Sequence, residues 1–407
     1  MDVLAREANC CSHVAYVRAA GLPMRLSDFH PLGEAHVHRF LVLTAAAVGL
    51  AACADSRSAT APTATESRVL ANRDGGGIAG AVYTSTNGVS GNAVVAYSRN
   101  EAGRLTRIGS FNTGGLGFGT GTDPLGSQFP VIVSEDHTHL YVVNAGSNDI
   151  TVFDVQRDGG LVRRQRVDSR GSTPVSLALH EGRLYVLNQG DNTVAAFAVH
   201  DDGSVNAIGQ RALPAGAAGA STVRAHGRVL IVSERNTNRL DLFPLDDAGR
   251  IGLPTTVASN GATPFGFDVR HSGLILVSEA GPNAVSSYRL LDLTFRLEDG
   301  SVPSNGNATC WVRLSHDESF AVTANAASAS MTAFHVDLNG TLHQTAIGTL
   351  PTGSGPLDVD VTQDDRFVYA VEANALGIGA FEIGGDGHLT PLPGATSVGG
   401  TEGLAAF

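Results

Sequence analysis

Residues 140–155 read LYVVNAGSNDITVFDV, and residues 184–199 read LYVLNQGDNTVAAFAV. Half of the sixteen positions are identical, and the second copy begins 44 residues after the first. Self-similarity at a fixed period of about 20–50 residues is typical of repeat architectures, in which each copy is one supersecondary unit. The stretch therefore predicts a repeat protein with a period near that spacing.

The aromatic residue near the end of each copy can be followed along the whole chain. It recurs at spacings of 56, 44, 46, 45, 46 and 47 residues, as Tyr97, Phe153, Phe197, Phe243, Tyr288, Phe334 and Phe381. An asparagine stands five residues before it in the first five copies, and Ala329 and Leu376 take that place in the last two. The chain thus contains seven copies.

Each copy reads as β-strands joined by tight turns. Runs such as LYVV are short, apolar and β-branched, whereas TVFDV alternates with the period of two that a half-covered strand shows. The turns contain residues that tolerate left-handed backbone, such as 146–148 and 201–203. A less regular strand and then an inner apolar run, such as TPVSLAL at 173–179, complete the unit. Four strands in about 45 residues make one propeller blade, so the sequence predicts an all-β, seven-bladed β-propeller.

The ends of the chain predict how the ring closes. The first copy begins at Ala79 with a second-type strand and has no inner strand before it. The last copy is followed by TEGLAAF at 401–407, which aligns with an inner strand. An open ring would leave exposed strand edges, so we expect 401–407 to pair with residues 81–86.

Composition agrees with this fold and excludes several functions. The chain has 49 glycines, 43% apolar and only 16% charged residues, which suits a tightly turned β-protein. Its net charge of −12, without a basic cluster, makes nucleic acid an improbable partner. All 27 basic residues are arginine, so Schiff-base chemistry and the phosphate-binding lysine of a P-loop are excluded.

The segment before Ala79 predicts export. Basic residues precede an eleven-residue apolar run at 40–50, which is too short to span a membrane and is typical of a secretory signal. The run leads to Leu50-Ala51-Ala52-Cys53, which resembles a bacterial lipobox, with ordinary cleavage at small residues as the alternative. We predict a signal peptide at 1–52 (with 1–23 as an over-long start before Met24), a lipidated Cys53 with a flexible tether at 53–78, and the propeller at 79–407.

The repeat resembles those of a known family. The repeat is similar to that of the lactonase-type seven-bladed propellers, which include 6-phosphogluconolactonase-like proteins and 3-carboxymuconate cyclases. The shared order is Leu-Tyr-Val-x-Asn, then Asn, then an aromatic strand, then Gly, then a Pro that opens an inner strand. The resemblance covers residues 79–407. It implies a lactonase-like hydrolase or cycloisomerase acting on a small anionic or sugar-derived substrate, although propellers host many unrelated activities.

Candidate site residues follow from blade geometry. The end of strand two and the start of strand one lie on the same side of a blade, so the strand-two ends form a ring: Asn87, Asn144, Asn188, Glu234, Glu279, Asn325 and Glu372. Asparagine often bonds its own backbone at a strand end, whereas glutamate is a poorer turn residue. The resemblance implies Glu279 as the acid/base. We expect the carboxylates of Glu234 and Glu279 to lie close together and shift each other's pKa.

The family's basic partners are absent from their usual place. Lactonase-type members carry Arg or His after the Pro that opens an inner strand, where this chain has apolar residues: Val131, Val175, Phe265 and Leu357. Arg235 and Arg224 are the candidates to replace them as the cation for a substrate anion. We therefore predict Glu279, Glu234 and Arg235 as catalytic residues, and the substrate-binding set is Glu372, Asn144, Asn188, Asn325 and Phe265.

Two function classes stay open from the sequence. One is a cell-envelope enzyme of lactonase or cyclase type, and the other is a non-catalytic binding or scaffolding propeller of the envelope. No cofactor is predicted, although Ca²⁺ suits the oxygen ligands of the Asn/Glu ring. We expect a small-molecule ligand or envelope component as partner, membrane attachment through the lipid alone, and a monomer. An insertion between Asn112 and Phe129 should overhang the Glu side of the ring as a lid.

Overall fold

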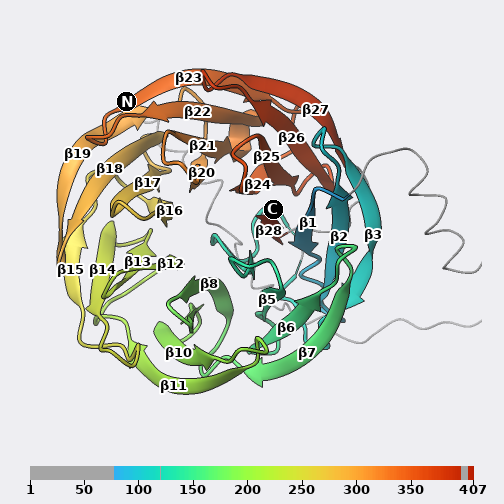
Figure 1. Ribbon diagram of the computed structural model, residues 1–407. Coiled ribbons are helices and arrows are strands. Elements are labelled where there is room, and N and C mark those ends of the chain that lie inside the picture. Colours follow the sequence, from blue (N-terminus) through green and yellow to red (C-terminus); the bar gives the residue numbers. More distant parts are fainter. Residues whose placement is uncertain (1–77, 120, 396–401) are drawn as a thin grey trace, which may run out of the picture. The chain divides into compact units, whose positions relative to one another are not determined.

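The computed structural model describes residues 78–119, 121–395 and 402–407. Seven four-stranded antiparallel sheets stand around one axis, as Figure 1 shows. The predicted seven-bladed propeller is therefore confirmed. The predicted signal peptide and Cys53 lie outside the described residues, and within those residues no helix has the length and apolarity that a membrane span requires.

The blades are numbered along the chain, and each has its inner strand first. Blade 1 is β28 (Glu402–Ala406), β1 (Gly80–Ser85), β2 (Ala93–Arg99) and β3 (Leu105–Asn112); blade 2 is β4 (Val131–Val133), β5 (His139–Asn144), β6 (Asp149–Val155) and β7 (Leu161–Asp168); blade 3 is β8 (Pro174–His180), β9 (Arg183–Asn188), β10 (Thr193–Val199) and β11 (Val205–Ala212).

The remaining four blades repeat the order. Blade 4 is β12 (Ala220–His226), β13 (Val229–Glu234), β14 (Arg239–Pro244) and β15 (Thr255–Ala258); blade 5 is β16 (Pro264–Val269), β17 (Leu274–Glu279), β18 (Ala284–Leu291) and β19 (Thr294–Pro303); blade 6 is β20 (Thr309–Leu314), β21 (Phe320–Asn325), β22 (Ser330–Val336) and β23 (Leu342–Thr349); blade 7 is β24 (Pro356–Val361), β25 (Phe367–Glu372), β26 (Gly377–Ile383) and β27 (Leu389–Ala395).

A tyrosine of the second strand ties a blade to the next one in blades 1, 2, 3 and 7. The hydroxyl of Tyr141 donates to the carbonyl of Gly203 at 3.0 Å, and Tyr185 does the same to Gly249 at 3.2 Å. Tyr369 of blade 7 bonds Gly103 of blade 1 at 2.7 Å, which carries the pattern across the ring closure. A buried hydroxyl needs a partner, and here the partner is the turn between the third and fourth strands of the neighbouring blade.

The recurrent asparagine serves both a turn and a blade contact. Asn148 has φ +57°, a left-handed conformation that asparagine tolerates better than most residues. Its side-chain oxygen accepts the N–H of Thr173, just before the inner strand of the next blade, at 2.8 Å. Asn238 and Asn283 bond the following blades in the same way. Leu376 keeps the left-handed backbone, at φ +51°, with a side chain that does not favour it.

The C-terminal strand closes the ring as predicted. β28 pairs antiparallel with β1, with Tyr83 opposite Ala405 and Ser85 opposite Glu402. Leu404 and its neighbours in β28 are buried. The two sides of the ring are named here by what lies there: the rim side carries the ends of the second strands, and the hairpin side carries the turns between first and second strands. The described chain begins at Ile78, on the hairpin side, where Ala79 bonds Arg99.

Candidate functional site on the ring axis

The insertion of the first repeat enters the axis of the ring. Residues 123–129, called the plug, run inside the ring in Figure 1 (teal). The Ser127 hydroxyl donates to the carbonyl of Val175 in blade 3 at 2.8 Å. The Gln128 N–H donates to the carbonyl of Ser221 in blade 4, and the Gln128 side chain reaches Val312 of blade 6 at 2.7 Å. The insertion thus does more than overhang the rim side, because its last residues fill the axis.

Gln128 lies at the centre of the plug. Its carbonyl accepts the Ser176 hydroxyl at 2.6 Å, and its carboxamide receives the Val312 N–H and donates to the Val312 carbonyl. A Cβ on Gly266 would collide with the Gln128 Oε1. Only glycine allows the inner strand of blade 5 to approach this carboxamide so closely.

Two side-chain donors from different blades hold consecutive carbonyls of the plug. The guanidinium of Arg235 donates to the Gly126 carbonyl, and the indole Nε1 of Trp311 donates to the Ser127 carbonyl at 2.8 Å. Phe265 stands beside both donors, with the guanidinium carbon of Arg235 5.3 Å from its ring centroid and the Trp311 ring at 5.1 Å in an edge-on contact. The structure therefore brings Arg235 and Phe265, both predicted from the sequence, together on the rim side.

Three carboxyl groups accept the backbone N–H groups around the plug. Asp123 accepts Gly126 at 2.8 Å, Glu402 of β28 accepts Leu125 at 3.5 Å, and Asp358 of β24 accepts Phe129 at 3.2 Å. Asp358 also accepts Gly403 at 2.9 Å, so it links the plug to the closing strand. The plug forms no strand, and these carboxyls supply acceptors that a sheet would otherwise provide.

These carboxyls hold protons more strongly than exposed acids do. Burial raises the pKa of Asp123 to about 6, against the opposing effect of Arg235. Burial, with the charge of Asp123, raises the pKa of Asp358 to about 7. Burial and both neighbouring carboxylates raise the pKa of Glu402 well above its ordinary value. Acids with pKa values near 7 in a functional site are suited to general acid/base chemistry.

Glu279, the predicted base, is fully buried within blade 5. Its Oε1 accepts the Gly261 N–H at 2.7 Å and the Ser286 hydroxyl at 2.6 Å, and its Oε2 accepts the Ser301 hydroxyl at 2.6 Å. Glu234 is also fully buried, and it accepts the Ala218 N–H and the Thr237 hydroxyl. Each carboxylate therefore bonds within its own blade and the loop that leads into it. The catalytic roles of Glu279 and Glu234 stay predictions.

The carboxyl that adjoins Glu234 is Asp241 of the same blade. Burial, followed by a hydrogen bond with Glu234, raises the pKa of Asp241 to about 8. The sequence analysis paired Glu234 with Glu279 of the neighbouring blade, and that pairing stays a prediction. The Asp241–Glu234 interaction arises within one hairpin, because the third strand folds back beside the second.

The predicted substrate-binding residues of the ring have the same local arrangement. Asn144 donates to Thr151 at 2.9 Å, and Asn325 donates to Thr332 at 2.9 Å, each on the strand that follows. Asn188 donates to the Ser169 carbonyl at 3.1 Å. Glu372 is buried, and burial raises its pKa. Their substrate contacts stay predictions, and their observed contacts order the turns of the rim side.

The other cationic candidate, Arg224, lies toward the hairpin side. It pairs with Asp268 at 3.0 Å, and Asp268 also pairs with Arg313 at 2.9 Å. The guanidinium carbons of Arg224 and Arg313 stand 4.6 Å and 5.0 Å from the Phe129 ring centroid. Burial alone would raise the pKa of Asp268, but its arginine partners hold that pKa below its usual range. This network secures the far end of the plug.

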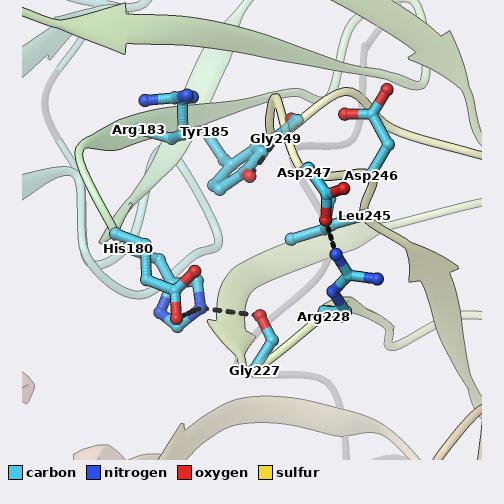
Figure 2. A pocket seen from close by; sticks show the side chains of 10 residues that line it. His180, Arg183, Tyr185, Gly227, Arg228, Leu245, Asp246, Asp247 and Gly249 are labelled. Carbon is cyan, nitrogen blue, oxygen red and sulfur yellow. Dashed lines mark hydrogen bonds and ion pairs between the residues drawn. The ribbon is translucent and has the colours of Figure 1, made fainter.

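A separate surface pocket of about 150 Å³ lies on the hairpin side between blades 3 and 4. Figure 2 shows the ion pair of Arg228 with Asp247 and the hydrogen bond from His180 to the Gly227 carbonyl at its edge. The hydroxyl of Tyr185, on the wall of this pocket, already donates a hydrogen bond to the Gly249 carbonyl of the next blade. Within the described residues, no group of three or more His, Cys, Asp or Glu side chains is arranged to hold a metal ion. Ca²⁺ at the ring stays a prediction.

Comparison with known proteins gives a family for part of the chain. Residues 90–216 match the sequence model "Lactonase, 7-bladed beta-propeller". Over this part the chain is similar to the lactonase-type seven-bladed propellers. The resemblance predicted from the repeats is thereby confirmed, on the residues of blades 1 to 3. No curated protein sequence matches the chain.

Solved structures show the same lactonase-type fold. A putative 6-phosphogluconolactonase from Bacteroides fragilis superposes with a TM-score of 0.65 at 16% identity, covering 85% of this chain and 100% of that one. One from Bacteroides uniformis gives 0.65 at 15% identity, over 81% and 99%. The periplasmic gluconolactonase PpgL from Pseudomonas aeruginosa gives 0.63 at 17% identity, over 80% and 98%. At these identities the comparison establishes the fold.

Sequence reasoning missed Asp123, Asp358, Glu402 and Trp311. A signal existed for two of them, because Asp358 and Glu402 are acids within inner-strand segments that are otherwise apolar or small. The long spacing between the first two aromatics revealed the insertion. Its entry into the axis had no sequence signal, because it depends on complementary surfaces from six blades.

Proposed function

We propose that this chain is an exported, membrane-anchored lactonase that opens the ring of a small anionic or sugar-derived lactone at the rim side of the axis. The observation that carries the proposal is the pair of donors, Arg235 and Trp311, aimed at carbonyl oxygens beside carboxyls with raised pKa values. The lactonase-like fold and the family match over residues 90–216 support the reaction class.

Hydrolysis of a lactone needs hydrogen-bond donors to the carbonyl oxygen and a group that accepts and returns a proton. Arg235 and Trp311 would take the lactone carbonyl oxygen and stabilise the negative charge that develops there when water adds. The Asp358 carboxylate would accept a proton from that water as the new carbon–oxygen bond forms. When the ring ester bond breaks, Asp358 returns the proton to the departing alkoxide oxygen. Lactone and water thus give one hydroxy acid, and the carboxylate is regenerated.

A pH-stat panel of sugar-derived and muconate-type lactones, run with Ca²⁺ and with EDTA, tests the reaction. We expect wild-type turnover of at least one lactone and a loss of about a hundredfold or more in Asp358→Asn and Arg235→Gln. Thermal unfolding and circular dichroism of each variant separate loss of chemistry from loss of fold. Equal turnover by wild type and both variants contradicts the proposed roles.

A binding or scaffolding propeller is the second candidate. The observation that favours it is the filled axis, in which the plug already bonds the donors and Gln128 joins several blades. The same lactone panel decides between them. No turnover of any lactone, combined with a thermal shift caused by an envelope component, supports the binding function.

The membrane attachment is proposed from the lipobox-like residues ending at Cys53. Cys53→Ala should remove incorporation of a radiolabelled fatty acid and shift the protein from the membrane to the soluble fraction. Unchanged fatty-acid labelling and membrane partitioning in Cys53→Ala contradict lipidation there.

A further inference from the structure

The plug presents two consecutive backbone carbonyls to two side-chain donors. Arg235 takes the carbonyl of Gly126, and Trp311 takes that of Ser127 at 2.8 Å. A backbone carbonyl offers the same acceptor oxygen as the carbonyl of a lactone or the carboxylate of its hydroxy acid. The donors are therefore already engaged by a group that resembles the ligand of the proposed reaction.

We propose that the plug is an internal competitor for the ligand site, and that a small lactone or hydroxy-carboxylate displaces it from Arg235 and Trp311. This inference rests on the proposed function for the identity of the ligand. It adds a conformational step, because the site exists in a plugged and an open state. A ligand that binds only the open state shifts the population toward that state.

The seated plug carries features that favour release. It has no strand pairing, and its N–H groups are accepted mainly by side chains. Phe129 has φ +68°, which is costly for a residue other than glycine. Asp123 of the plug lies beside the carboxyls of Asp358 and Glu402, so a second ionised carboxylate among the three adds repulsion.

Other contacts keep the plug seated without ligand. The Gln128 carboxamide clasps both backbone groups of Val312, and Phe129 is held between the guanidinium groups of Arg224 and Arg313. These contacts lie deeper along the axis than the two donors. They can therefore be weakened by mutation without altering the groups proposed to bind ligand.

The chain contains a single tryptophan, and it is Trp311. Its side chain is fully buried and bonded to the plug, so tryptophan fluorescence reports on this one contact. The full-length mature chain would be titrated with glucono-1,5-lactone and with gluconate, while emission maximum and acrylamide quenching are recorded. Sorbitol, a polyol with neither carbonyl nor carboxylate, is the ligand control. We expect a saturable red shift and increased quenching with the first two compounds only.

Gln128→Ala provides the decisive variant. Loosening the plug raises the open fraction, and apparent affinity rises in proportion, so we expect about tenfold tighter binding of gluconate. Gln165→Ala is the matched control, because Gln165 clasps the N–H and carbonyl of Val205 between blades 2 and 3, far from the axis. Gln165→Ala should bind gluconate as the wild type does, and Arg235→Gln should lose the response.

The outcomes separate this inference from the proposed reaction. Lactone turnover without a change at Trp311 leaves the lactonase standing and overturns plug displacement. A saturable Trp311 response without turnover supports plug displacement and removes the catalytic role. If folded Gln128→Ala shows no fluorescence response to either compound, or binds no more tightly than Gln165→Ala, the plug is a fixed part of the core and the inference is wrong.

Discussion

The indole nitrogen of Trp311 donates a 2.8 Å hydrogen bond to the backbone carbonyl of Ser127, a residue that precedes it by 184 positions. Neither residue belongs to the repeat motif that defines the fold. The bond joins the inner strand of blade 6 to an insertion that follows blade 1. It shows that an insertion outside the repeat fills the axis, and that its contacts with the inner strands hold opposite parts of the ring together.

Replacing Trp311 with phenylalanine should destabilise the protein. The Ser127 carbonyl would lose its donor in a buried site, which costs about 1–3 kcal/mol of unfolding free energy. Urea unfolding followed by circular dichroism measures the loss. An unchanged transition midpoint would mean that water or another donor satisfies the carbonyl, and that the plug is less closely packed than its contacts indicate.

Deleting residues 402–407 should open the ring. Blade 1 would lose its inner strand, and Leu404 alone buries a side chain whose loss costs about 2–5 kcal/mol. We expect a sharply lower melting temperature and a tendency to associate through the exposed edge of β1. Calorimetry and light scattering check both results. A truncated chain as stable and as monomeric as the full chain contradicts the closure role of β28.

Stability should fall as pH rises from about 4 to about 7. Unfolded Asp358 releases its proton near its ordinary value of 3.8, whereas the folded state keeps it up to about 7. In this interval the folded state binds more protons, so raising the pH favours unfolding. Asp358→Asn should flatten that part of the profile, as measured by chemical unfolding at each pH. An identical pH dependence in wild type and variant shows that Asp358 is not protonated when folded.

The roles of Glu279 and Asp358 should separate by mutation. Glu279→Gln places an amide where three donors converge, so we expect a loss of about 1–3 kcal/mol of stability with turnover retained. Asp358→Asn should instead remove turnover. The two variants are compared by their initial rates on the lactone that the wild type hydrolyses. The rates are measured at a temperature below the unfolding transition of each variant. If Glu279→Gln loses turnover and Asp358→Asn keeps it, Glu279 is the general base, as the sequence predicted.

Leu376→Asn should stabilise the protein. Leu376 adopts φ +51° at a turn position where Asn148, Asn192, Asn238 and Asn283 have the same left-handed backbone, and nearly half of its side chain is exposed. Asparagine tolerates this backbone at lower cost, which is worth about 1 kcal/mol. Thermal unfolding measures the gain, and Asn148→Leu, the reverse change at an equivalent turn, should destabilise. A lower melting temperature for Leu376→Asn would show that leucine packing outweighs the backbone cost.

The repeat made most of the fold predictable. The spacing of aromatics such as Phe153 and Phe197 determined the number of blades, because each aromatic occupies the same buried place in its sheet. The unpaired strands at the two ends predicted closure by the same logic. Both inferences depend on the order and spacing of residues within each repeat, and these can be read from a single sequence.

The site was less predictable, because its residues lie in no common motif. Arg235 was predicted because it follows Glu234 at the end of a second strand, and Phe265 because it follows the Pro that opens an inner strand. The two side chains are in contact in the structure. Asp123 and Glu402 lie far apart in the chain and interact only through the axis. No periodicity predicts such a contact. The sequence placed Glu279 at a strand end, and its burial follows from Ser286 of the next strand and Gly261 of the loop before β16, which both bond its carboxylate.

The closing strand also sets the order in which this protein can mature. β1 pairs with β28, which comes from the opposite end of the propeller sequence, so blade 1 has no complete sheet until the last strand has been made. During synthesis from the N-terminus, β1 can pair with β2, but its inner edge stays unpaired until Ala406 has been added. The complete ring can therefore form only after the last strand has been made, and the incomplete ring is the form that folding catalysts and proteases would first meet.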